Sequence, residues 1–89
     1  MSARELLKIY GMQVTMPRIL VIEDLMNNRF HATADEIFRR VNKRDESVSR
    51  ATVYNVLNAL LENKAVRALT IDDKQMHYDI YLTPHAHFR

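Results

Sequence analysis

The stretch SRATVYNVLNALLENKAVRALTI, residues 49–71, decides the fold because its hydrophobic period changes partway along. Its apolar residues first recur at helical spacing, and the closing VRALTI is typical of a β-strand. Ser49 is a favourable N-cap, and Asn63 can adopt the left-handed conformation that ends many helices. We therefore predict a helix over about 50–62 that leads directly into a strand.

The two sides of this helix differ in bulk and polarity. One side is a leucine-rich stripe that we expect to face the core, made of Val53, Leu57, Leu60 and Leu61. The other side is slim and polar, made of Ala51, Thr52, Asn55 and Asn58, with Arg50 and Tyr54 at its flank. A helix that enters a groove needs such small residues with directional donors and acceptors. The simpler interpretation is that these side chains only solvate the helix.

Three further helices precede this one. Apolar spacing predicts them over about 3–10, 16–27 and 34–44. Gly11 suits the end of the first, and Thr15 with Pro17 suits the start of the second. Thr33 and Glu36 have the T-x-x-E spacing of a capping box at the start of the third. The stretches NNRFH and RDESV are predicted loops.

After the last helix the period of the apolar residues becomes two. In MHYDIYL they alternate with His77, Asp79 and Tyr81, which indicates a half-buried strand with a polar outer face. DDKQ has turn composition, so residues 66–82 are predicted to form a β-hairpin. Two helices joined by a short loop and followed by a hairpin form a winged helix, an α+β fold. A helical bundle with a hairpin and no nucleic-acid role is the alternative.

The bulk composition is that of one small globular domain. The chain has 89 residues, of which 47% are hydrophobic and 27% charged, and this balance argues against disorder. It contains no cysteine, so it can form neither a disulfide nor a cysteine-ligated zinc site. A cytoplasmic location is compatible with that absence. The start MSARELLKIYG is too short and too charged for a secretory signal, and we expect no membrane association.

The charge pattern allows two interpretations. The net charge of +2 favours anionic partners only weakly, but basic residues cluster at Arg39, Arg40, Lys43 and Arg44. Cations are favoured in the last turn of a helix, so the cluster is explained equally well as a solvated helix end. The other interpretation is a patch that faces phosphates.

Catalytic motifs are missing from the chain. A single glycine excludes a glycine-rich phosphate loop, and there is no thiol nucleophile. Ser49 is better explained as an N-cap, and no histidine lies near it in sequence. We therefore do not expect an enzyme. A small hydrolase that uses the His and Asp side chains is kept as a third hypothesis.

The helix over 50–62 is instead a candidate DNA-reading element. Asparagine can pair bidentately with adenine, arginine with guanine or a phosphate, and tyrosine with a phosphate. Free N–H groups at a helix N-terminus also attract phosphate. Another phosphate candidate lies at the start of the second helix. The predicted DNA-contacting residues are Arg18, Arg50, Ala51, Thr52, Tyr54 and Asn55.

A second group of residues has the chemistry of a metal site. His85 and His87 form an H-x-H pair, and extended backbone points both side chains to one face. Together with His31 and Asp79 they offer three imidazoles and a carboxylate, which suit iron(II), manganese(II) or zinc. The alternative is that these histidines are ordinary surface residues, and the last five residues can fray.

Several motifs together resemble the DNA-binding half of the ferric uptake regulator family. They are VTMPR followed by ILVIEDL, HATADEIF, SRATVYNVLNALLENKAV and HYDIYLTPHAHF. The resemblance covers the chain from Gly11 to Phe88. It implies a dimeric, metal-responsive bacterial transcription regulator, a repressor whose winged helix reads a palindromic double-stranded operator. The genes that it controls would serve metal homeostasis or the response to oxidative stress.

The resemblance also implies roles for the candidate metal ligands. The peroxide-sensing branch of the family carries an aspartate at the position of Asp79, and the matching regulatory ligands are His31, Asp79, His85 and His87. In that branch bound iron(II) reacts with peroxide and oxidises histidines, here matched by His31 and His85, which releases DNA. Manganese(II) is the other regulatory metal expected. An iron- or zinc-uptake regulator and a winged-helix protein-interaction module are the alternatives.

The chain departs from the family pattern at its end. That pattern runs H-x-H-x-x-C, and this chain stops at Arg89, before the cysteine. We therefore expect residues 1–89 to be a DNA-binding fragment without the C-terminal domain that supplies dimerisation and a structural zinc. The full-length protein would be a homodimer and the fragment a monomer with an incomplete metal site. Its DNA affinity would be near the non-specific range, roughly 10⁻⁴ to 10⁻⁶ M.

Overall fold

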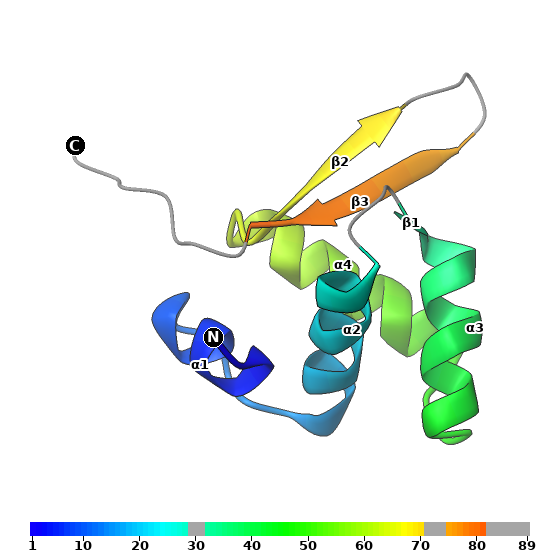
Figure 1. Ribbon diagram of the computed structural model, residues 1–89, viewed down its shortest axis with the longest axis horizontal. Helices are drawn as coiled ribbons and strands as arrows, with labels where there is room; N and C mark the ends of the chain where they lie inside the picture. Colours follow the sequence, from blue (N-terminus) through cyan, green and yellow to red (C-terminus); the bar gives the residue numbers. More distant parts are fainter. Residues whose placement is uncertain (29–31, 71–74, 82–89) are drawn as a thin grey trace.

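The computed structural model describes residues 1–28, 32–70 and 75–81, which contain four helices and three strands (Figure 1). In chain order these are α1 (Ala3–Ile9), α2 (Met16–Asn27), β1 (Ala32–Thr33), α3 (Ala34–Arg44), α4 (Arg50–Glu62), β2 (Val66–Thr70) and β3 (Met76–Ile80). The last three predicted helices therefore have the predicted bounds, and the first ends one residue earlier. The helix pair α3–α4 followed by the β2–β3 hairpin confirms the α+β winged helix.

The sheet has one more strand than the sequence indicated. Its order is β1-β3-β2 and all pairs are antiparallel, with Arg67 opposite Asp79 and Ala32 opposite Tyr78. Two residues are too few to produce an alternating pattern, so β1 was not predicted. Its existence depends on the neighbouring edge of β3, which lies far away in sequence. The strand leads without a gap into α3, because Thr33 both ends β1 and caps the helix.

The helix starts follow from their caps. The side chains of Thr15, Thr33 and Ser49 each accept a hydrogen bond from a backbone N–H in the first turn, as predicted. Thr33 and Glu36 form the full capping box: the Glu36 carboxylate accepts from the Thr33 N–H at 2.9 Å. The hydrogen bond from Thr33 N–H lowers the pKa of Glu36. A second capping box, from Ser2 and Glu5, starts α1.

One predicted helix end is correct and one is wrong. Gly11 has φ of +70°, the left-handed conformation expected after α1. At the end of α4 that conformation belongs to Lys64, with φ of 60°, while Asn63 keeps φ of −90°. The Asn63 amide donates to the Ala59 carbonyl at 2.8 Å, which holds Asn63 against the last turn and moves the reversal one residue on.

The core lies where α4 crosses the other elements. α2 packs between α1 and α3, and α4 contacts α2, α3 and β2 (Figure 1). The predicted stripe of α4 is buried at Val53, Leu57 and Leu60, whereas Leu61 is half-buried. Val56, which the stripe left out, is buried as well. Fully buried partners from the other elements include Leu6, Leu7, Val21, Ile22, Leu25, Ile37, Val41 and Ile80.

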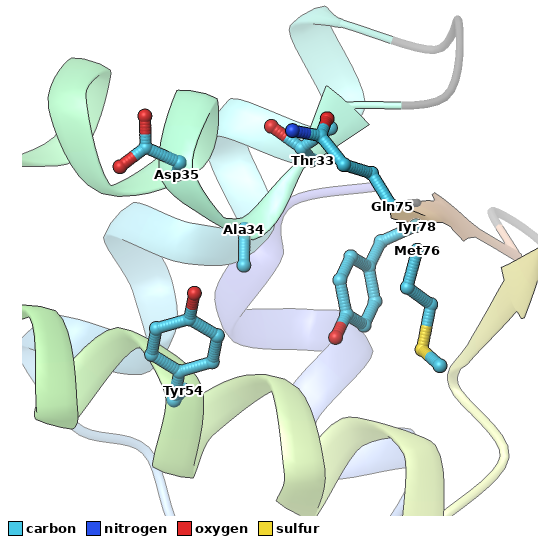
Figure 2. Close-up of a pocket in the computed structure, with 7 residues that line it drawn as sticks. All are labelled: Thr33, Ala34, Asp35, Tyr54, Gln75, Met76 and Tyr78. Carbon is cyan, nitrogen blue, oxygen red and sulfur yellow. The ribbon is translucent and has the colours of Figure 1, made fainter. Parts of the chain in front are cut away.

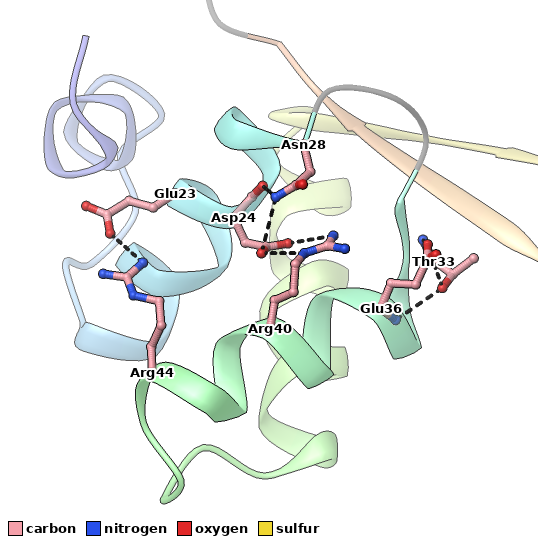
Figure 3. Close-up of polar contacts among 7 residues, drawn as sticks. All are labelled: Glu23, Asp24, Asn28, Thr33, Glu36, Arg40 and Arg44. Carbon is pink, nitrogen blue, oxygen red and sulfur yellow. Dashed lines mark hydrogen bonds and ion pairs between the residues drawn. The ribbon is translucent and has the colours of Figure 1, made fainter.

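Arg39, Arg40 and Arg44 of the basic cluster form ion pairs within the chain, and Figure 3 shows the pairs of Arg40 and Arg44. Arg40 Nε and Nη2 donate to the two Asp24 carboxylate oxygens at 2.8 and 3.0 Å. Arg44 pairs with Glu23 at 2.9 Å, and Arg39 pairs with Asp35 at 2.8 Å. The sequence left open a solvated helix end and a patch that faces phosphates. These ion pairs argue against the phosphate-facing patch. The positive charge of this cluster is largely matched by carboxylates of α2 and α3.

The Asp24–Arg40 pair lies deeper than the others. The Asp24 side chain is 7% exposed and also accepts a hydrogen bond from Asn28. Arg40 is 36% exposed, so its guanidinium bridges from solvent to a carboxylate in the core. A buried carboxylate without its partner is costly because water cannot replace the lost hydrogen bonds.

We therefore expect Arg40→Ala to lower the free energy of unfolding by about 3 kcal/mol, the cost of leaving a buried carboxylate unpaired. Arg44→Ala is the matched control, because its pair with Glu23 is exposed and worth at most about 1 kcal/mol. Urea unfolding followed by circular dichroism measures both. Equal losses in the two variants would contradict the importance of the buried pair.

Candidate nucleic-acid interface

The outward side of α4 is slim in the structure, as the sequence predicted. Ala51, Asn55 and Asn58 are exposed, Thr52 is half-buried, and Tyr54 is 40% exposed. The helix starts at the Ser49 cap, whose hydroxyl accepts from the Thr52 N–H at 3.1 Å. The positive end of the helix dipole therefore lies beside these polar side chains.

A groove of about 320 Å³ joins this side of α4 to the start of α2. Its lining residues come from both helices and the segment before α2: Gln13, Thr15, Pro17, Arg18, Thr52, Asn55 and Val56. Three predicted DNA-contacting residues, Arg18, Thr52 and Asn55, thus share one concave surface although they lie far apart in sequence. Such a surface can present a cation and a directional amide to the same strand of a duplex.

Arg18 is held ready at the rim of this groove. Its Nη1 donates to the Gln13 carbonyl at 2.9 Å, and its backbone N–H donates to Thr15 Oγ1 at 3.4 Å. The bond to Gln13 restricts the side chain without neutralising its charge, because a carbonyl carries no formal charge. The guanidinium keeps other N–H groups that can reach a phosphate.

Arg50 behaves differently from Arg18. Its Nη1 donates to the Asp35 carboxylate on α3, and its guanidinium lies 4.5 Å from the centre of the Phe38 ring. The hydrogen bond from Arg50 lowers the pKa of Asp35. Arg50 is predicted to contact DNA, but in the structure it forms an ion pair and a cation–π contact within the chain. Sequence reasoning missed Asp35, because only the packing of α3 on α4 brings it to Arg50.

A second hollow of about 210 Å³ is lined in part by Tyr54 of α4 (Figure 2). Its lining joins the start of α3, the side of α4 and the start of β3: Thr33, Ala34, Asp35, Tyr54, Gln75, Met76 and Tyr78. Met76 is exposed although the strand pattern placed it on the buried side. Burial raises the pKa of Tyr78. Tyr54 therefore lies at the edge of a hollow between the helix pair and the hairpin.

Of the four predicted metal ligands, the structure describes Asp79, while His31, His85 and His87 lie outside the described residues. The Asp79 side chain is 14% exposed and accepts a hydrogen bond from Arg67 on β2 at 3.3 Å. Ala32, which directly follows His31, pairs with Tyr78, which directly precedes Asp79. Within residues 1–28, 32–70 and 75–81, no three His, Asp or Glu side chains come together as a metal site.

In the part of the chain that the structure describes, no helix has the length and apolar character needed to cross a bilayer.

Comparison with known proteins places this geometry in a family. The model of the "Ferric uptake regulator family" matches residues 10–89. The "Peroxide operon regulator" of Bacillus subtilis (strain 168) is 35% identical over 86 residues, which are 97% of this chain and 59% of that protein. The chain therefore spans less than two thirds of this curated relative.

Solved structures show the same fold. PerR from Streptococcus pyogenes, described as acting in peroxide sensing and gene regulation, is 29% identical with a TM-score of 0.76. The match covers 90% of this chain and 58% of that one. The Vibrio cholerae ferric uptake regulator, whose DNA-binding domains rearrange, is 26% identical with a TM-score of 0.79. That match covers 92% of this chain and 63% of the other.

The Ser49 N-cap is predicted to stabilise the start of α4, which carries the exposed polar side chains. We expect Ser49→Ala to lower the free energy of unfolding by about 1 kcal/mol, because the Thr52 N–H loses its acceptor. Asn58→Ala, on the exposed middle of the same helix, should cause no loss, since alanine is the better helix former. Thermal unfolding measures both, and an unchanged Ser49→Ala variant would show that the cap contributes nothing.

Proposed function

The chain belongs to the ferric uptake regulator family, and from this premise we propose that residues 1–89 are the DNA-binding domain of a metal-dependent transcriptional repressor that responds to peroxide. The protein would act in the cytoplasm as a homodimer on a palindromic double-stranded operator. The matched relatives are regulators and not enzymes, which agrees with the missing catalytic motifs.

The groove between α2 and α4 is the observation that carries this proposal. It places Arg18 of α2 beside Thr52 and Asn55 of α4. These two residues lie on the side of α4 opposite its buried leucine-rich stripe. In a winged helix the second helix of the pair enters the major groove, and slim side chains allow close approach to the bases. Asn55 is suited to pair with an adenine, and Arg18 to contact a phosphate that fixes the position of the helix.

Tyr54 and Arg50 extend the proposed interface toward the hairpin. Tyr54 is 40% exposed on α4 and lines the second hollow, so it can contact the sugar-phosphate backbone or a base edge. The small side chain of Ala51 allows DNA to approach the first turn of α4 closely. Arg50, the preceding residue, is a further proposed DNA contact. In a homodimer two copies of α4 would read half-sites about one helical turn apart.

The regulatory site is proposed at His31, Asp79, His85 and His87. Its three imidazoles and one carboxylate suit iron(II) or manganese(II). The carboxylate of Asp79, on β3, is 14% exposed. Iron(II), when bound, supplies a centre that reacts with peroxide. Binding of one metal ion by these four residues would favour one arrangement of the two DNA-binding domains in the dimer. A structural zinc is proposed only for the part of the relatives that this chain does not match.

The sheet gives Asp79 a direct connection to the helices. β3 carries Asp79 and pairs with β1, and β1 runs into α3 through Thr33. Asp79 also pairs with Arg67 of β2, so its carboxylate joins the two strands of the hairpin. A ligand that draws Asp79 away from Arg67 would therefore act on the elements that support α4.

A protein-interaction module is the second candidate function. Exposed Met76 and Tyr54 beside the second hollow favour it, because such residues are common in protein interfaces. Salt separates the two functions. DNA binding should weaken steeply as salt rises, in proportion to the number of phosphate contacts, whereas an apolar contact should not.

For the DNA contacts we expect Arg18→Ala to weaken binding to all duplexes about equally and to reduce the slope of log K against log salt by about 0.9, one phosphate contact. Arg4→Ala is the matched control, since it removes the same charge from the exposed side of α1. Fluorescence anisotropy with a mixed-sequence duplex measures both. Equal slopes in the two variants would remove Arg18 from the interface.

Asn55→Ala should act on sequence preference instead. Selection from a random duplex library with the wild-type chain, followed by single base-pair changes in the selected site, defines the preference. We expect the variant to lose discrimination of about 1–3 kcal/mol at one base pair while keeping the salt slope. Unaltered preference would show that Asn55 does not read a base.

For the metal site we expect Asp79→Asn to weaken manganese(II) binding about tenfold or more, since a neutral amide is a poor substitute for a carboxylate ligand. Asp45→Asn, in the exposed turn after α3, is the control of equal charge. Isothermal titration of each variant with manganese(II) gives the comparison. Equal affinities would exclude Asp79 as a ligand.

A further inference from the structure

Arg50 differs from the other predicted DNA-contacting residues in having a carboxylate partner inside the chain. Its guanidinium pairs with Asp35 and lies over the Phe38 ring, both on α3. The pair is open to solvent, with side-chain exposures of 52% for Arg50 and 36% for Asp35. It can therefore open without unfolding the domain, and exposed pairs of this kind are weak.

Asp35 offers Arg50 the same kind of hydrogen-bond acceptor that a DNA phosphate offers. Carboxylates and phosphates both accept hydrogen bonds from the guanidinium fork of arginine. Asp35 sits at the start of α3 and pairs with Arg50 in the first turn of α4, so its charge lies beside the start of the helix proposed to enter the duplex. The hydrogen bond from Arg50 lowers the pKa of Asp35, which favours the charged carboxylate in this pair.

Arg39 supplies the element that makes an exchange of partners feasible. It lies one turn after Asp35 on α3 and contacts the other carboxylate oxygen at 2.8 Å. When Arg50 leaves, Asp35 still has a cationic partner and is not left as an isolated charge beside the phosphates. Phe38 remains below Arg50, so the side chain can change its hydrogen-bond acceptor while keeping one of its contacts.

We propose that Asp35 is an internal competitor of DNA phosphate for Arg50 and thereby limits non-specific DNA binding. The proposal rests on the proposed function and adds a residue that determines specificity. On an unsuitable sequence α4 sits loosely, and Arg50 stays with Asp35 and makes no phosphate contact. Where base contacts fix α4, a phosphate replaces Asp35 and Arg50 contributes to binding.

The test measures binding of the 89-residue chain to a mixed-sequence duplex over a range of sodium chloride concentrations. Asp35→Asn should bind several-fold more tightly than wild type, and its slope of log K against log salt should steepen by about 0.9, one added phosphate contact. Asp45→Asn removes the same charge from the turn after α3 and should change the slope much less. Asp35→Ser serves as a second variant, with circular dichroism to check folding.

A double-mutant cycle assigns the effect to Arg50. In an Arg50→Ala background, Asp35→Asn should have no more effect than Asp45→Asn. The proposal is overturned when Asp35→Asn binds no more tightly than Asp45→Asn, or when its gain persists without Arg50. If the wild-type chain shows no salt-dependent binding to any duplex, the proposed function itself fails. Duplex binding of the wild type with no gain in Asp35→Asn rejects this inference alone.

Discussion

Burial of the leucine-rich side of α4 is the constraint on which the rest of the molecule depends. Val53, Leu57 and Leu60 exclude water from the junction at which α4 contacts α2, α3 and β2. Because an α-helix repeats every 3.6 residues, fixing this side also fixes which residues face outward. The exposure of Ala51 and Asn55 is thus a consequence of core packing.

The charges of the chain are divided between structure and surface. Arg40 pairs with the buried Asp24 of α2. Arg39 pairs with Asp35 of α3, and Arg44 pairs with Glu23 of α2. A cluster that looks basic in the sequence therefore supplies little net positive potential. Arg18, whose hydrogen-bond partners in the structure are neutral, keeps its charge available to an anion. This division explains how a chain of net charge +2 can still present a local site for phosphate.

The short strand β1 connects the sheet to the helices. It pairs with β3, which carries Asp79, and its last residue caps α3 through the Thr33–Glu36 capping box. Asp35 lies one residue further into α3 and reaches Arg50 on α4. Strand pairing, the direct continuation of β1 into α3 and the Asp35–Arg50 ion pair therefore form a series of contacts from the sheet that carries Asp79 to the start of the proposed reading helix. Such a series is a physical route by which ligand binding at the sheet can alter α4.

Local chemistry determined the elements, and tertiary packing decided how their residues meet. The caps at Thr15, Thr33 and Ser49 and the change of period after Glu62 depend on neighbours in sequence, so helices, hairpin and slim face could be read directly. β1, the Arg50–Asp35 pair and the groove shared by Arg18 and Asn55 could not, because each joins segments that approach only when the core forms. The same reason explains the basic cluster. Its composition was visible in the sequence, but its partners on α2 were brought within reach by helix packing alone.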